Sequence, residues 1–110
     1  MKQIIDILAE AAIDGNRDAF GKLVAQHDPL VRGVVFRRVG DWDVSEDLAQ
    51  ETLLAAHANI DQLRDSYAFA AWLCRIARNL SANWIRSEQY GGRPFVFRRR
   101  ALHDDRYENG

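Results

Sequence analysis

The residues that point most directly to a chemistry are arginines and asparagines within residues 69–86, FAAWLCRIARNLSANWIR. At about 100° per residue, a helix over this stretch gathers one polar set on one side: Arg75, Arg78, Asn79, Asn83 and Arg86. Trp72 lies at the border of that side. Guanidinium groups neutralise phosphates, amides reach base edges and an indole stacks on bases, so this side suits a nucleic acid. An ordinary solvated helix face is the alternative.

Enzyme chemistry has weak support in this sequence. His27, His57 and His103 fall on different expected elements and lack the paired spacing of metal ligands. The chain has no nucleophile elbow and no glycine-rich phosphate loop. We therefore expect no catalysis, no metal and no cofactor. The single cysteine, Cys74, excludes an internal disulfide and fits a reducing compartment.

Composition predicts one small domain with two unlike surfaces. The 110 residues, 47% of them hydrophobic, suffice for a single core. The formal net charge is only −1, but residues 41–65 hold seven acids and one arginine, and residues 75–100 hold seven arginines and one glutamate. These segments carry −6 and +6, which indicates two partners of different character. No apolar run has the length of a membrane span and no signal peptide is visible, so we expect a cytoplasmic protein without a membrane partner.

Helical periodicity predicts an all-α bundle with a three- to four-helix core plus a short N-terminal helix over residues 2–13. Asn16 is expected to cap the next helix. A new helix is expected at Asp28–Pro29, the alternative being a proline kink in one longer helix. Residues 30–39 are rich in β-branched and aromatic side chains, which favour a strand. Because no partner strand is visible elsewhere in the sequence, we interpret this segment as helix.

The second informative helix is expected over residues 44–60, opened by a capping box of Asp43 and Glu46. Leu54 falls on its polar side, where an apolar anchor with a charged rim suits a protein partner. A lone exposed leucine without function is the alternative. Asp65 or Ser66 is expected to cap the long helix that follows. The helical domain is expected to span residues 1–90, with residues 91–110 as a linker or frayed tail.

Two motifs of this sequence resemble region 2 of bacterial RNA polymerase sigma factors, and the closest resemblance is to the extracytoplasmic-function (ECF) group of the sigma-70 family. The first is carried by Phe69, Trp72-Leu73, Ile76-Ala77-Arg78-Asn79 and Arg86, and the second by the upstream block EDLAQE at residues 46–51. The resemblance implies a transcription initiation domain that binds core RNA polymerase, at the clamp coiled coil of its largest subunit. It implies as further partners the non-template strand of the promoter minus-ten element and an anti-sigma factor.

The resemblance also implies roles for particular residues. The polymerase-binding set is Asp47, Gln50, Glu51, Leu54 and His57. In this group the loop before the long helix forms a pocket for one flipped base, and that loop matches residues 61–66. Asn59, Arg64 and Tyr67 are then expected near the pocket. Trp72, as stacking platform or half core, and the arginine–asparagine set of residues 75–86 are expected along the strand or the adjoining duplex.

The chain departs from the family pattern in several places, so its DNA contacts are expected to be weaker or differently specific. Ala70 stands where the family usually has a basic residue, and Asn83 where it often has an acidic one. His57 replaces an aromatic residue, and Ser87-Glu88-Gln89 stands where a run of basic residues is usual. Region 4, the C-terminal helix-turn-helix of complete sigma factors, is expected to be absent. Two rival interpretations follow: a sigma-like protein-interaction module without productive DNA binding, and an independent regulator that binds duplex DNA without polymerase.

Overall fold

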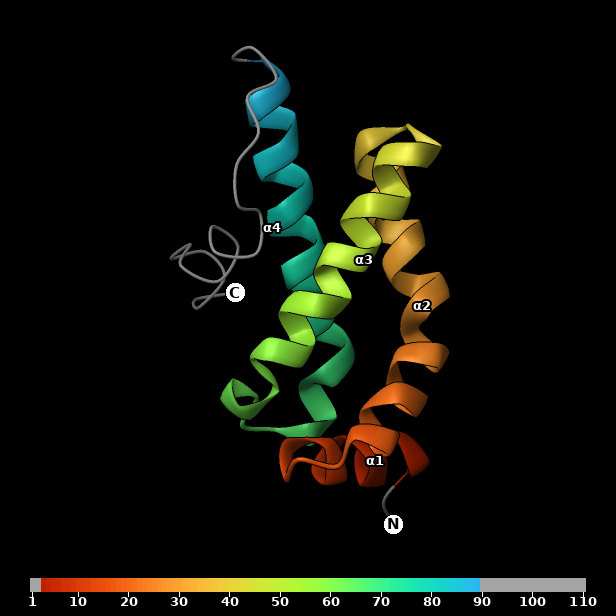
Figure 1. Cartoon of the computed structure of the whole chain (residues 1–110), viewed down its shortest axis with the longest axis vertical. Helices are drawn as coiled ribbons and strands as arrows, with labels where there is room; N and C mark the ends of the chain where they lie inside the picture. The colour runs from red at the N-terminus through yellow and green to blue at the C-terminus, as the bar shows by residue number, and fades with distance from the viewer. Residues whose placement is uncertain (1–2, 90–110) are drawn as a thin grey trace.

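The computed structural model describes residues 3–89, which form helices and contain no strand. The elements in chain order are α1 (Ile4–Ile13), α2 (Arg17–Val39), α3 (Trp42–Ala58), η1 (Ile60–Gln62), η2 (Ser66–Ala68) and α4 (Phe69–Gln89). Helices α2, α3 and α4 form an elongated bundle, and α1 lies across one end of it (Figure 1). The all-α expectation is confirmed. The expected tail, residues 91–110, lies outside the described residues.

The helix ends follow from short polar side chains and one glycine. The Asn16 side chain accepts a hydrogen bond from the Ala19 amide at 3.0 Å, which confirms the expected cap of α2. Gly40 ends α2 at a φ of 68°, a left-handed conformation that favours glycine. Asp41, not Asp43, then caps α3 by accepting from the Val44 amide at 3.0 Å. The capping box expected at Asp43 is therefore wrong, because Asp41, two residues earlier, already accepts from a free amide at the start of α3.

Helix α2 runs without interruption through Pro29, so the expectation of a new helix at this point is wrong. Proline has no N–H for the carbonyl four residues earlier, which belongs to Ala25. Ala25 and Pro29 are both exposed, so water can reach that carbonyl. Asp28 is free for another role: its carboxylate accepts from Arg32 Nε at 2.7 Å, and Arg32 also pairs with Glu46 of α3. This surface network joins α2 to α3.

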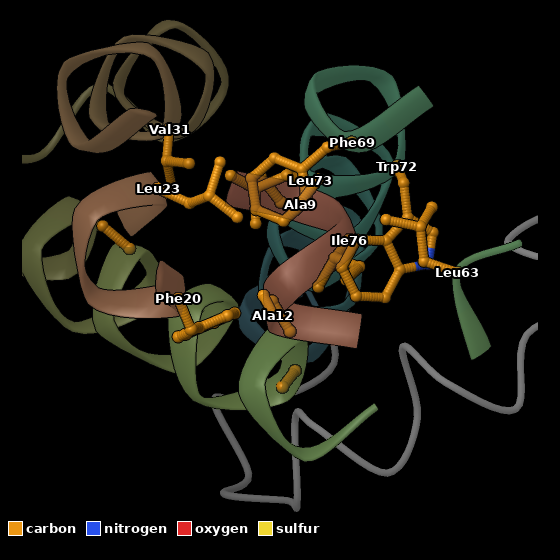
Figure 2. Close-up of a cluster of buried hydrophobic side chains, with 14 of the residues drawn as sticks. Ala9, Ala12, Phe20, Leu23, Val31, Leu63, Phe69, Trp72, Leu73 and Ile76 are labelled. Carbon is orange, nitrogen blue, oxygen red and sulfur yellow. The ribbon is translucent and has the colours of Figure 1, made fainter. Parts of the chain in front are cut away.

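The core is built around α4, which contacts α2, α3 and η2. Helical spacing places Phe69, Leu73, Ile76, Leu80 and Trp84 on one apolar stripe of α4. The first four are fully buried, whereas Trp84 is only half-buried. Figure 2 shows side chains from several helices directed into this cluster. Because α4 has neighbours on more than one side, its buried arc is wider than a single stripe. No helix within residues 3–89 is long and apolar enough to cross a bilayer.

Candidate nucleic-acid and protein interfaces

An open pocket of about 760 Å³ lies where the loop between α3 and α4 meets the start of α4. Its lining consists of Asp61, Gln62, Leu63, Arg64, Asp65, Ala68, Trp72 and Arg75. Leu63 and Trp72 are buried and supply an apolar, aromatic floor, whereas the charged side chains are exposed or half-buried and supply the rim. Its size lies within the range of ligand pockets. The pocket can therefore receive a flat aromatic group with a polar edge.

The structure brings three of the expected DNA-binding residues to this pocket: Arg64, Trp72 and Arg75. Trp72 is largely a core residue, because it is only 8% exposed, and it also lines the pocket. Its indole packs near Phe69, with ring centroids 6.0 Å apart. A ring held in this way offers a preformed surface for stacking, since the core already restricts its movement.

Asn59 and Tyr67 do not line the pocket. The Asn59 side chain donates to the Ala55 carbonyl at 3.0 Å and accepts from Gln62 Nε2 at 3.0 Å. It therefore joins the last turn of α3 to the loop that follows. Tyr67 is 66% exposed, and its backbone amide donates to the Asp65 carboxylate at 2.9 Å. Sequence reasoning named the pocket loop but did not single out Asp61, Gln62 and Asp65 as lining residues. The polar loop composition was the only signal for them.

The polar side of α4 is narrower than expected. Arg78 and Arg86 are exposed and Arg75 is half-buried, but Asn79 and Asn83 are only 8% and 3% exposed. The expectation that both asparagines lie on the open side is therefore wrong. Helical spacing locates the centre of the buried stripe, whereas the packing of α4 against both α2 and α3 sets its width.

Asn83 is connected to the open side through Arg86. Its Oδ1 accepts a hydrogen bond from Arg86 Nη2. The Nδ2 atoms of Asn79 and Asn83 are buried and have no hydrogen-bond partner within residues 3–89. Asn83 is thus placed to orient a guanidinium rather than to touch a ligand itself.

A second, apolar groove of about 370 Å³ lies between α2 and α3. It is lined by Phe20, Val24, Gln50, Leu53, Leu54 and His57. Leu54 is 49% exposed, and the His57 ring meets the Phe20 ring edge-on with centroids 5.0 Å apart. The structure thus brings together three residues of the expected polymerase-binding set: Gln50, Leu54 and His57.

Asp47 and Glu51 of the same set do not line the groove. Asp47 is exposed and Glu51 half-buried, so they belong to the surrounding acidic surface of α3. Phe20, Val24 and Leu53 are groove residues that sequence reasoning missed. Phe20 and Val24 follow the apolar period of residues 17–24, which by itself predicts core positions. Nothing in that period distinguishes a core residue from one that also borders an open groove.

His27 lies in the core, unlike His57, which lines the apolar groove. His27 is buried, its Nδ1 donates to the Leu23 carbonyl at 2.8 Å, and its ring meets that of Phe69 with centroids 4.9 Å apart. No group of three or more His, Cys, Asp or Glu side chains that could hold a metal occurs in residues 3–89. His27 is therefore best understood as a core residue whose polar atom is satisfied by its own helix.

Fold and surfaces together define an all-α binding domain with a polar pocket at one end and an apolar groove between two helices. Comparison with protein-family models identifies the family of this domain. Residues 23–90 match the family model described as Sigma-70 region 2. The chain therefore belongs to the sigma-70 region 2 family, and its relatives place it in the ECF group.

Three relatives illustrate the relationship. The ECF RNA polymerase sigma factor BldN of Streptomyces coelicolor is 41% identical over 87 residues, 76% of this chain and 32% of the relative. SigW of Bacillus subtilis is 35% identical over 75 residues, 68% and 40% of the two chains. The ECF RNA polymerase sigma-E factor of Escherichia coli K12 is 33% identical over 110 residues, 99% and 56%. The chain thus spans from about a third to just over half of these relatives, and no solved structure gave a significant match.

Proposed function

We propose that this chain is a cytoplasmic transcription initiation domain that joins core RNA polymerase and recognises and melts the promoter minus-ten element. The observation that carries the proposal is the pocket beside the basic side of α4, with Trp72 in its floor and Arg75 on its rim. The relatives are named RNA polymerase sigma factors, which supports the same role. A regulator of this domain, an anti-sigma factor, would act by covering its two surfaces.

Strand separation requires that the protein return the stacking energy that the duplex loses. Extruding a base costs a few kcal/mol, and stacking a base on an aromatic side chain returns about 1–3 kcal/mol. The pocket supplies that aromatic surface in Trp72. Arg78 and Arg86, both exposed on α4, supply phosphate contacts beyond the pocket. Binding of the unpaired non-template strand would thereby be favoured over binding of the closed duplex.

The apolar groove between α2 and α3 is the proposed docking site for the clamp coiled coil of the polymerase. Leu54 provides a half-exposed apolar anchor, and Gln50 and His57 provide polar groups next to it. Interfaces of this kind concentrate their energy in a few central anchors surrounded by a polar rim. Among residues 3–89, no residue lines both this groove and the pocket at the start of α4, so the two proposed binding sites are formed by separate side chains.

Arg78→Ala is expected to weaken binding to single-stranded DNA without changing binding to core polymerase. One lost phosphate contact lowers the slope of log K against log salt by about 0.7 for a single strand. The measurement is fluorescence anisotropy of a labelled random-sequence 20-mer at several salt concentrations, with and without core enzyme. Arg38→Ala is the matched control, because Arg38 is also an exposed arginine but belongs to α2. Equal salt slopes for the two variants would exclude Arg78 as a phosphate contact.

Asn83→Ala and Arg86→Ala are expected to have non-additive effects on the same DNA. If Asn83 acts by orienting the guanidinium of Arg86, its removal loses nothing once Arg86 is absent. The measurement is a double-mutant cycle on the dissociation constant, with helix content followed by circular dichroism. Strictly additive effects would instead mean that Asn83 contacts the strand directly or acts only through stability.

A sigma-like interaction module without productive DNA binding is the second candidate function. The burial of Asn79 and Asn83 favours it, because two of the amides expected at base edges are not open to a ligand. Fluorescence binding to a single-stranded minus-ten oligonucleotide, with and without core enzyme, distinguishes the candidates. Binding only with core supports the initiation role, and binding with neither supports the interaction module. Binding to duplex without core indicates an independent regulator.

A further inference from the structure

An exposed aromatic pair lies at the turn between α2 and α3, outside both the pocket and the groove described above. Trp42, at the start of α3, is 71% exposed. Its indole stacks on the half-buried Phe36 of α2, with ring centroids 4.0 Å apart and ring planes at 17°. Phe36 therefore covers one face of the indole and leaves the other face open. A ring held in this way is a surface on which a cationic group can stack.

Two carboxylates next to this indole have no partner within residues 3–89. Asp43 and Asp47 are exposed and lie one turn apart on α3, and neither makes a hydrogen bond or ion pair in that part of the chain. The neighbouring acids are engaged, because Asp41 caps α3 and Glu46 pairs with Arg32. A guanidinium is planar and charged, so it can stack on an indole and donate to carboxylates at the same time. The chemistry of this place therefore fits an arginine.

We call this place the aromatic corner, and define it by Phe36, Trp42, Asp43 and Asp47. The adjoining last turn of α2 has the opposite charge, because Arg37 and Arg38 are exposed there. A purely basic ligand would be repelled on that side, so the best match carries arginines and acids in separate groups. Residues 93–105 of this chain, RPFVFRRRALHDD, have this arrangement, with three consecutive arginines at 98–100 and two acids at 104 and 105.

The position of α4 brings these residues within reach of the aromatic corner. The end of α4 and the turn between α2 and α3 lie at the same end of the bundle, opposite α1 (Figure 1). Arg98 is nine residues beyond Gln89, the last residue of α4. Nine extended residues span up to about 30 Å, and the domain measures 26 and 21 Å across its two shorter axes. Such a short tether also gives an effective concentration in the millimolar range, so weak exposed contacts are sufficient.

We propose that residues 93–105 fold back on the aromatic corner, where an arginine from 98–100 stacks on Trp42 and pairs with Asp43 and Asp47. The acids that follow in the same segment then lie near the exposed arginines of α2. Asp47 is also one of the expected polymerase-binding residues, so the docked segment would cover part of that surface of α3.

The test follows the exposure of Trp42 in the full chain labelled with 5-fluorotryptophan. The substitution Trp42→Phe assigns its fluorine resonance among the three tryptophans of the chain. The measured quantity is the change in chemical shift of that resonance between H2O and D2O, which increases as the fluorine becomes more exposed to solvent. We expect a larger isotope shift in the triple variant R98Q/R99Q/R100Q than in the unmodified chain, because glutamine removes the charge that holds the segment. Equal isotope shifts would overturn the proposal.

A second pair of substitutions connects the effect to the aromatic corner. The double variant D43N/D47N is expected to increase the isotope shift as the triple variant does, and to add nothing when combined with it. The matched control D14N/D18N removes two charges from exposed acids where α1 meets α2, and should change nothing. Additive effects of the two sets would mean that they do not act through one contact and would overturn the proposal.

Dilution of the labelled chain separates this contact from one between two copies. An isotope shift that is independent of protein concentration supports docking within one chain. A shift that increases on dilution would mean that a second copy supplies the arginine, which would overturn the intramolecular contact. Neither the pocket at the start of α4 nor the apolar groove takes part, so each of these failures would leave the proposed function standing.

Discussion

Leu54→Asp is expected to weaken binding to core RNA polymerase at least about 30-fold, which corresponds to a hot-spot loss of about 2 kcal/mol or more. Leu54 is half-exposed at the apolar groove between α2 and α3. A carboxylate at this position would lose the apolar contact and would have to enter a dry interface without a partner. The measurement is a titration of labelled chain with core enzyme.

Leu30→Asp is the matched control for this experiment. Leu30 is a leucine of α2 that is 41% exposed, close to the 49% of Leu54, but it does not line the groove. We expect Leu30→Asp to bind core polymerase as the unmodified chain does, and both variants to retain their helix content by circular dichroism. Equal affinity of the two variants for core enzyme would mean that the groove is not the docking site.

Phe69→Ala is expected to lower the free energy of unfolding by about 3–5 kcal/mol, the usual cost of emptying a buried phenylalanine site. Phe69 is 1% exposed and meets the ring of His27 from α2 as well as that of Trp72 from its own helix. Small domains are stable by only about 5–15 kcal/mol, so this one side chain supports a large share of the total. The measurement is urea unfolding followed by circular dichroism at 222 nm.

Tyr67→Ala serves as the control for stability, because Tyr67 lies two residues away and is 66% exposed. Substitutions at exposed positions usually change stability by less than about 0.5 kcal/mol. If Phe69→Ala lost no more stability than Tyr67→Ala, the start of α4 would not be the centre of the core. The Phe69 variant is also expected to disturb the pocket, since Trp72 would lose a neighbour in the core.

Local chemistry was sufficient to predict the all-α class and some of the helix ends. Asn16 caps α2 as expected and Gly40 ends it, because each of these residues acts on backbone groups a few positions away. Apolar periodicity also predicted the buried residues Phe69, Leu73, Ile76 and Leu80. The errors at Pro29 and Asp43 arose where two local signals compete: Asp28-Pro29 can begin a helix or lie within one, and Asp41 and Asp43 are both possible caps of α3.

Only the assembled bundle decided which side chains remain open. Asn79 and Asn83 have the spacing of a polar face, yet they are buried because α4 packs against α2 and α3 together. The apolar groove needs Phe20 and Val24 beside Leu54, and these residues are about 30 positions apart in the chain. Helical period depends on the backbone of one segment and can be deduced from it. The width of a buried arc and the walls of a groove depend on neighbouring helices, so they are defined only when the chain has folded.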